Sequence, residues 1–200
     1  MSTYVPRFTV PDTGDINYKN INYGGKNRCI VRNTATGSVL PNCTGYAWGR
    51  CLELNGSSTL PATNANTWYN NSSNYEHGST PKLGAVICYN GGYYGGAGHV
   101  AVVEQINDDG TILTSESNYS GGKYFFVVRT LSPNDKYSIY DENGKRIPVN
   151  FQGFIYLGDW ESPDNPYNPD DPNPPAPSGK KRSIMILLLK KLKDKRGIKI

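Results

Sequence analysis

The sequence predicts an α+β fold in which N-terminal helices pack on a five- to six-stranded antiparallel sheet. Two helical segments occur before residue 72, whereas apolar residues alternate in the manner of strands from Pro81 onward. Asn107-Asp108-Asp109-Gly110 is a turn of the kind that joins antiparallel strands. Leucine is scarce before residue 180, and Gly, Asn, Tyr and Ser are abundant, which is typical of a loop-rich domain rather than a helical bundle.

The first part of the chain predicts an extended segment followed by two helices. Residues 1–28 carry Pro and Gly at short intervals, which favours extended backbone. Residues 42–54 predict a helix, because Asn42 is a good N-cap and the apolar residues that follow recur at helical spacing. Residues 63–69 predict a short second helix.

The strand pattern appears in five later segments. Each one is rich in β-branched or aromatic residues and is bounded by turn residues. The segments are residues 84–89, 99–106, 111–115, 124–129 and 151–157.

Beyond these strands the composition changes twice. Residues 161–179 are Pro, Asp, Asn and Ser with almost no apolar side chains, which predicts a solvated linker. Residues 180–200 are apolar and then basic, which predicts a basic amphipathic tail. The sequence therefore predicts one catalytic domain over residues 1–160, a linker and a tail.

The charge of the chain is divided between the tail and the rest. Residues 180–200 hold nine of the 21 Lys and Arg residues and one of the 17 Asp and Glu residues. Because the remaining residues are mildly acidic, the domain is not expected to bind nucleic acid. The tail fits an interfacial helix on an anionic membrane, contact with anionic wall polymers, a helix that docks on a partner, or a disordered segment. Its apolar run is too short to span a bilayer.

Four cysteines are present, at positions 29, 43, 51 and 88, and none forms a Cys-x-x-Cys pair. This spacing argues against zinc. Within one helix Cys43 and Cys51 would lie roughly 12 Å apart, too far for a disulfide. Cys29, Cys51 and Cys88 are interpreted as small buried hydrophobic residues.

The remaining cysteine, Cys43, lies where a nucleophilic thiol is expected. Cys43 opens the predicted helix, and a helix N-terminus lowers the pKa of a thiol. His99, one of only two histidines, opens a later apolar strand and could serve as the base. The other histidine, His77, lies in a polar segment and is interpreted as a surface loop residue.

A third group follows from the predicted hairpin. Two strands joined by the turn at 107–110 bring residues 115–118 back beside His99. Glu116 and Asn118 are two positions apart, so they share a face of the strand. A carboxylate or amide there can accept the imidazole N–H and fix its tautomer. Each residue also has an ordinary structural interpretation, such as a buried thiol or a solvated hairpin charge. Glu104 shows no evident role.

Five segments of this chain resemble the CHAP family, the cysteine, histidine-dependent amidohydrolases/peptidases. The segments are NCTGYAWGR at 42–50, GAVI at 84–87, GHVAVVE at 98–104, SESNY at 115–119 and GFIY at 153–156. The resemblance covers roughly residues 20–160 with order and spacing kept. It implies a papain-like fold and cleavage of bacterial peptidoglycan, either at the N-acetylmuramoyl-L-alanine amide or within the peptide.

The resemblance also implies a role for each candidate residue. Cys43 would be the nucleophile, His99 the base and Glu116 the orienting acid, and Asn118 matches a fourth polar position near the oxyanion or the imidazole. No cofactor is expected. Some members carry a calcium loop of Asp residues before the cysteine, but residues 29–42 contain no Asp or Glu, so no metal is expected there.

The form of the 42–50 motif resembles bacteriophage endolysins most closely. Residues 1–7 lack the apolar core of a signal peptide. A phage lysin would stay in the host cytoplasm until holin-mediated release to the wall, or travel in the virion. Two other functions fit the same residues: a CHAP-fold amidase acting on a soluble small substrate, and a non-catalytic virion or wall-binding protein.

Overall fold

The computed structural model describes residues 2–12, 14–19, 22–23, 26–27, 40–92 and 96–163. The chain divides into two units, Met1–Pro163 and Asp164–Ile200, and only the first lies within the described residues. The predicted linker from residue 164 onward, the predicted tail and Cys29 fall outside them. No helix in the described ranges is long and apolar enough to cross a membrane.

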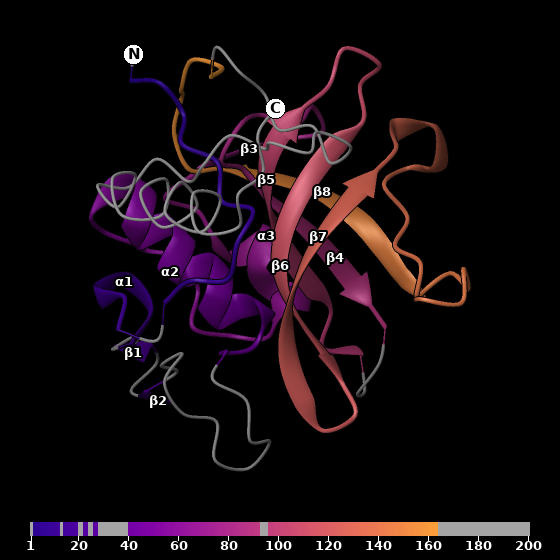
Figure 1. The fold of residues 1–200 in the computed structure, drawn as a ribbon, viewed down its shortest axis with the longest axis horizontal. Helices are drawn as coiled ribbons and strands as arrows, with labels where there is room; N and C mark the ends of the chain where they lie inside the picture. Colours follow the sequence, from indigo (N-terminus) through magenta and orange to yellow (C-terminus); the bar gives the residue numbers. More distant parts are fainter. Residues whose placement is uncertain are drawn as a thin grey trace, which may run out of the picture. The chain divides into compact units, whose positions relative to one another are not determined.

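One antiparallel sheet forms the centre of the first unit (Figure 1). Its six strands follow the order β3-β8-β4-β5-β6-β7. The strands are β3 (Glu76–Gly78), β4 (Val86–Gly91), β5 (His99–Ile106), β6 (Ile112–Ser120), β7 (Lys123–Leu131) and β8 (Val149–Tyr156). A separate pair joins β1 (Asn22–Tyr23) to β2 (Lys26–Asn27). The predicted α+β architecture with a five- to six-stranded antiparallel sheet is confirmed, and the sheet has six strands.

The main helix of the first unit, α2 (Cys43–Asn55), packs against β5 and β6. It begins where the Asn42 side chain accepts a hydrogen bond from the N–H of Gly45 at 2.9 Å. It ends at Gly56, whose φ of 70° is the left-handed conformation that glycine adopts without strain. The predicted N-cap is confirmed, and the nucleophile candidate is the first residue of the helix.

The other helical segments are short. They are α1 (Ile16–Lys19), η1 (Ala65–Thr67), α3 (Trp68–Asn71) and η2 (Pro133–Asp135). The second predicted helix is therefore a 3₁₀ turn that continues as one α turn. The prediction of extended backbone through residue 28 is wrong at α1.

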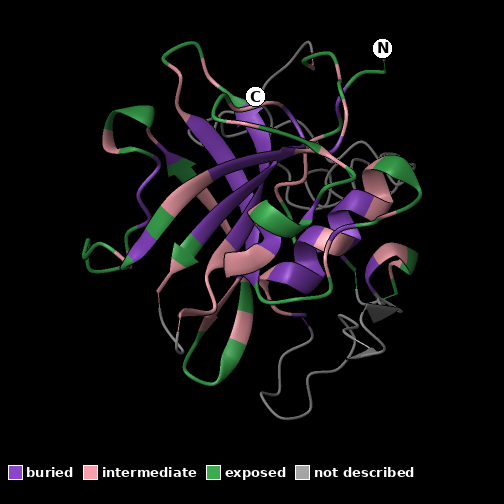
Figure 2. Ribbon diagram, turned by 180° about the vertical axis from the view of Figure 1, so that it is seen from behind, coloured by how far each residue is buried: buried purple, intermediate pink, exposed green. Residues whose placement is uncertain are grey.

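Two apolar clusters cover the two faces of the sheet. On the face toward α2, Tyr46, Ala47 and Cys51 of the helix pack with Val100 and Val102 of β5. On the opposite face, Ala101 and Val103 of the same strand join residues from the loop after β7. Figure 2 shows this burial along the central strands and along α2. Strand alternation thus gives β5 two buried faces.

Two expectations about individual residues are wrong. Glu104 is fully buried and pairs with Arg50 of α2, at 2.9 Å from Nη2 to Oε2. His77 is exposed as expected, but it belongs to the edge strand β3 rather than a loop.

Candidate active site

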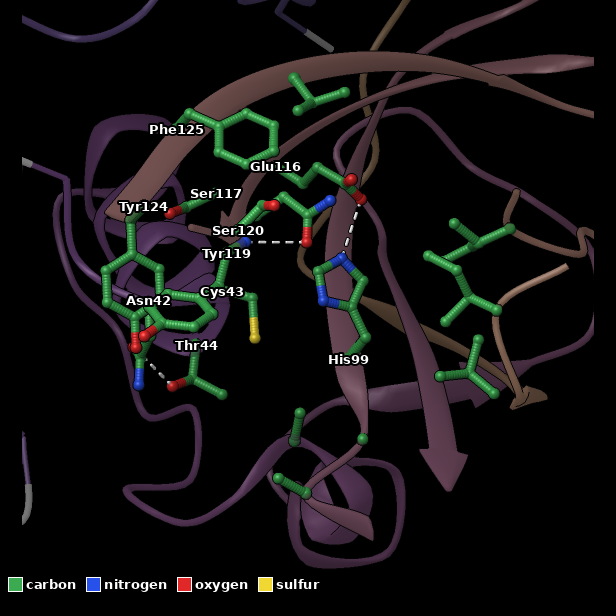
Figure 3. Close-up of a pocket in the computed structure, with 18 of the residues that line it drawn as sticks. Asn42, Cys43, Thr44, His99, Glu116, Ser117, Tyr119, Ser120, Tyr124 and Phe125 are labelled. Atoms are coloured by element: carbon green, nitrogen blue, oxygen red, sulfur yellow. Dashed lines mark hydrogen bonds and ion pairs between the residues drawn. The ribbon is translucent and has the colours of Figure 1, made fainter. Parts of the chain in front are cut away.

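The thiol of Cys43 and the ring of His99 meet where α2 and β5 both begin. Figure 3 shows the Cys43 side chain beside the ring of His99 in a cleft. The cleft has a volume of about 850 Å³ and is lined by residues of α2, β5, β6 and β7. Both side chains therefore come from the first residue of an element, and the packing of α2 on β5 brings these two starts together.

Gly98 sets the position of His99. Its φ is +74°, a conformation that residues with a side chain rarely adopt. A Cβ built on Gly98 would lie 2.5 Å from the backbone nitrogen of Asn66. The chain therefore needs glycine here to pass between neighbouring segments and enter β5 with the ring in the cleft.

The predicted return of the hairpin is present. Val102 pairs with Ser115 across β5 and β6, so the strand brings residues 116–118 back beside His99. The Nε2 atom of His99 lies 2.8 Å from Oε2 of Glu116, whose carboxylate is 1% exposed. Because Nε2 is bound to Glu116, Nδ1 is the ring nitrogen left for the thiol.

Asn118 lines the same cleft but plays a different part from Glu116. Its Oδ1 accepts a hydrogen bond from the N–H of Tyr119 at 2.9 Å. Within the described residues no hydrogen bond joins Asn118 to His99. The structure thus places His99 between Cys43 and Glu116. The Asn118 amide lies at the wall of the cleft and does not join this series.

The electrostatics of the cleft favour a charged thiolate–imidazolium pair. Burial by itself raises the pKa of the Cys43 thiol, but the charge and hydrogen bonding of His99 and the N–H of Val100 lower it below its ordinary value of 9.0. Burial likewise disfavours a charged ring, yet Glu116 and the Cys43 thiolate raise the pKa of His99 to about 10. These shifts favour the thiolate form of Cys43 and the protonated form of His99.

Glu116 has a second cationic partner that the sequence analysis missed. The Nε atom of Arg129, on β7, donates to Oε1 of Glu116. Arg129 was the last residue of a predicted strand, and the register of β6 with β7 places it diagonally across from Glu116. That register was the signal that could have identified it.

Among the described residues, no group of three or more His, Cys, Asp or Glu side chains is arranged to hold a metal ion. His77 lies away from the cleft, where Nε2 is 2.8 Å from the hydroxyl of Ser72. Cys51 and Cys88 are fully buried in the core, and burial raises the pKa of the Cys88 thiol. One thiol and one imidazole of the described chain thus face the cleft.

Residues 33–118 match the family model described as CHAP domain. The staphylococcal secretory antigen SsaA of Staphylococcus aureus is 39% identical over 112 residues, which cover 54% of this chain and 42% of that protein. The probable autolysin SsaALP of the same species is 36% identical over 95 residues, 46% of this chain and 35% of that protein. The N-acetylmuramoyl-L-alanine amidase sle1 of Staphylococcus epidermidis is 36% identical over 91 residues, 44% and 27% respectively.

Among solved structures, an N-acetylmuramoyl-L-alanine amidase from Staphylococcus aureus matches with a TM-score of 0.43 and 25% identity. That match covers 69% of this chain and 36% of the amidase chain. The present chain spans less than half the length of the curated relatives named above.

Proposed function

We propose, from the match of residues 33–118 to the CHAP domain model, that this chain is a peptidoglycan hydrolase that cleaves an amide bond through a cysteine thiolate. The proposal depends on one observation: Cys43, His99 and Glu116 line the same cleft, and His99 contacts the carboxylate of Glu116. The names of two relatives, an amidase and a probable autolysin, support wall cleavage as the reaction class.

The proposed reaction has two halves. In the first, the Cys43 thiolate attacks the amide carbonyl carbon, a C–S bond forms, and the C–N bond breaks as His99 gives its proton to the leaving amine. In the second, neutral His99 takes a proton from water, whose oxygen attacks the thioester and releases the acid product and the thiolate. The first N–H groups of α2 have no partner within the helix, so that of Cys43 is suited to hold the oxyanion.

Two finer points belong to this proposal. The bond cut is the N-acetylmuramoyl-L-alanine amide or a bond within the peptide. The form of the 42–50 motif supports a bacteriophage lysin, which acts from the host cytoplasm after holin-mediated release or from the virion. Anionic wall polymers or membrane lipids are proposed partners of residues 180–200, since that segment is strongly basic.

Clearing of purified cell walls tests the proposal. The parent protein should lower wall turbidity, and Cys43→Ala should abolish this, because no other group in the cleft supplies a thiolate. Cys88→Ala is the matched control, since its buried thiol faces the core; it should keep activity in protein that stays folded. Clearing by folded Cys43→Ala protein near the parent rate would exclude the thiol mechanism. Mass spectrometry of the released fragments would identify the bond.

A further inference from the structure

Glu116 is shared between two cationic groups, of which only His99 takes part in the proposed proton transfers. His99 holds Oε2 and Arg129 holds Oε1, so both carboxylate oxygens are occupied. The carboxylate is 1% exposed, and these partners replace the water that it has lost.

The backbone and a second hydrogen bond hold Arg129 in this place. Glu116 pairs with Val127 and Thr114 pairs with Arg129, so all four side chains share one face and Arg129 lies diagonally across from Glu116. Its Nη1 atom donates to the carbonyl oxygen of Tyr140 at 3.0 Å. The Arg129 side chain is 18% exposed and lines the same cleft as Cys43. These two hydrogen bonds fix the planar guanidinium of Arg129, so it is already oriented to hold the carboxylate of Glu116.

We propose that Arg129 is a positioning residue that keeps Glu116 ionised and aligned through both halves of the reaction. The inference rests on the proposed function. The role of Arg129 matters most in the second half of the reaction, after His99 has given its proton to the leaving amine. At that point Glu116 has lost its imidazolium partner, and a buried carboxylate without a cation tends to take up a proton. The Arg129 guanidinium, which contacts the other oxygen of the same carboxylate, stabilises that carboxylate when the imidazole is neutral.

A shared carboxylate also holds the imidazolium less tightly than an unshared one. In the thioester intermediate the charge of Cys43 is gone, and Glu116 alone would favour the protonated ring. His99 must be neutral to take a proton from water, so loss of Arg129 should slow the release of the acyl group more than its formation. The same loss should shift the acid limit of activity to higher pH.

Several charged or titratable groups surround Glu116 and bear on this pH dependence. His99 of β5 and Arg129 of β7 contact it, while Cys43 of α2 and Tyr89 of β4 interact with its charge. Burial raises the pKa of Glu116, but His99 and Arg129 outweigh burial and hold that pKa below its ordinary value. Beyond Arg129, the cleft is lined by Asp141 and Glu142.

The test compares Arg129→Met with Arg129→Lys, using soluble fragments of the purified walls as substrate. Arg129→Met should lower kcat by about tenfold or more with a smaller change in kcat/KM, because the second half of the reaction is slowed. A thioester on Cys43 should accumulate, detected by mass spectrometry after an acid quench. The acid limb of kcat should move up by about one pH unit, the effect expected for loss of an adjacent opposite charge. Arg129→Lys keeps the charge and should restore the parent acid limb.

Arg146→Met is the matched control. Arg146 is exposed and donates to the hydroxyl of Ser138 rather than to the cleft, so this change should leave the pH profile as in the parent. Folded Arg129→Met protein with the parent pH profile and no thioester would overturn the inference. So would an Arg129→Lys variant that shows a raised acid limb, and this comparison stands even if Arg129→Met fails to fold. If the parent itself cleaves no wall, or Cys43→Ala is equally active, the proposed function fails and this inference falls with it.

Discussion

The two histidines of this chain are distinguished by their neighbours rather than by their burial alone. His99 follows a glycine that places it in the cleft, and its ring contacts Glu116. His77 lies on the exposed edge strand β3, where its ring contacts Ser72 and packs edge-on against Tyr69. Their substitutions should therefore have opposite effects on activity.

His99→Ala should abolish wall clearing as completely as Cys43→Ala, since it removes the proton donor and the cation that lowers the pKa of the thiol. His77→Ala should be nearly silent. Glu116→Gln should be milder than His99→Ala, because an amide still orients the ring but stabilises its cation poorly. Clearing rates of the three folded variants measure this order. An inactive His77→Ala protein beside an active His99→Ala protein would reverse the assignment.

The pH dependence of activity should follow the thiolate–imidazolium pair. The pKa of Cys43 is lowered, so the thiolate persists to lower pH than in a free cysteine. The pKa of His99 is raised to about 10, so its ring stays protonated up to that pH. Activity should rise as pH passes the lowered pKa of the thiol and fall near pH 10 as the ring loses its proton. Initial clearing rates across this range provide the measurement, and activity still increasing above pH 10 would contradict it.

At the scale of the elements, a buried ion pair joins the helix that carries Cys43 to the strand that carries His99. Arg50 of α2 and Glu104 of β5 meet through two hydrogen bonds of 2.9 and 3.0 Å, with side chains 2% and 0% exposed. The hydroxyls of Tyr4 and Ser115 also donate to Glu104, at 2.7 and 2.6 Å. The pair therefore fixes α2 against the sheet within a network that is fully hydrogen-bonded.

Glu104→Ala should lower the free energy of unfolding by about 3–5 kcal/mol, because removing one partner of a buried pair leaves an uncompensated charge. Chemical denaturation of the parent and variant measures the difference. Lys82→Ala is the control: Lys82 pairs with Asp159 at the surface and its loss should change stability little. Equal stability changes for the two variants would show that the Arg50–Glu104 pair adds nothing beyond a surface ion pair.

Local signals in the sequence predicted the elements well, and long-range contacts explain what it missed. Asn42 as a cap and the turn at 107–110 depend on neighbours within a few residues, so both could be predicted. Glu104 finds its partner on a helix 54 positions earlier, and no local pattern marks that contact. The edge strand β3 is three residues long and pairs with β8 near the end of the described chain, so its sequence has no room for alternation.

At the scale of the whole molecule, the ordered body extends beyond the CHAP match at both ends. Tyr4 is buried, and its hydroxyl reaches Glu104, while Thr3 bridges to Glu161. Residues 2–12 therefore complete the buried network although they precede the matched region 33–118. The sequence of this segment predicted only extended backbone, because a segment without helices or long strands carries no periodic pattern.

Deletion of residues 180–200 should leave the catalytic unit folded and active on purified walls, since its core lies within residues 2–163. It should weaken binding to anionic vesicles at low salt, because basic residues near an anionic surface each contribute on the order of 1 kcal/mol and salt screens them. Thermal unfolding and vesicle co-sedimentation test the two parts. Equal vesicle binding by both proteins at low salt would exclude a role in membrane binding.

Gly98 limits which mutations the candidate active site can accept. Any substitution there adds a Cβ that collides with backbone atoms, so we expect no other residue to fit at this position. A mutational scan scored only by activity would rank Gly98 with the nucleophile, although it has no side chain to offer the substrate. A substitution of Gly98 would therefore displace His99 from the cleft while the Cys43 thiol stayed in place.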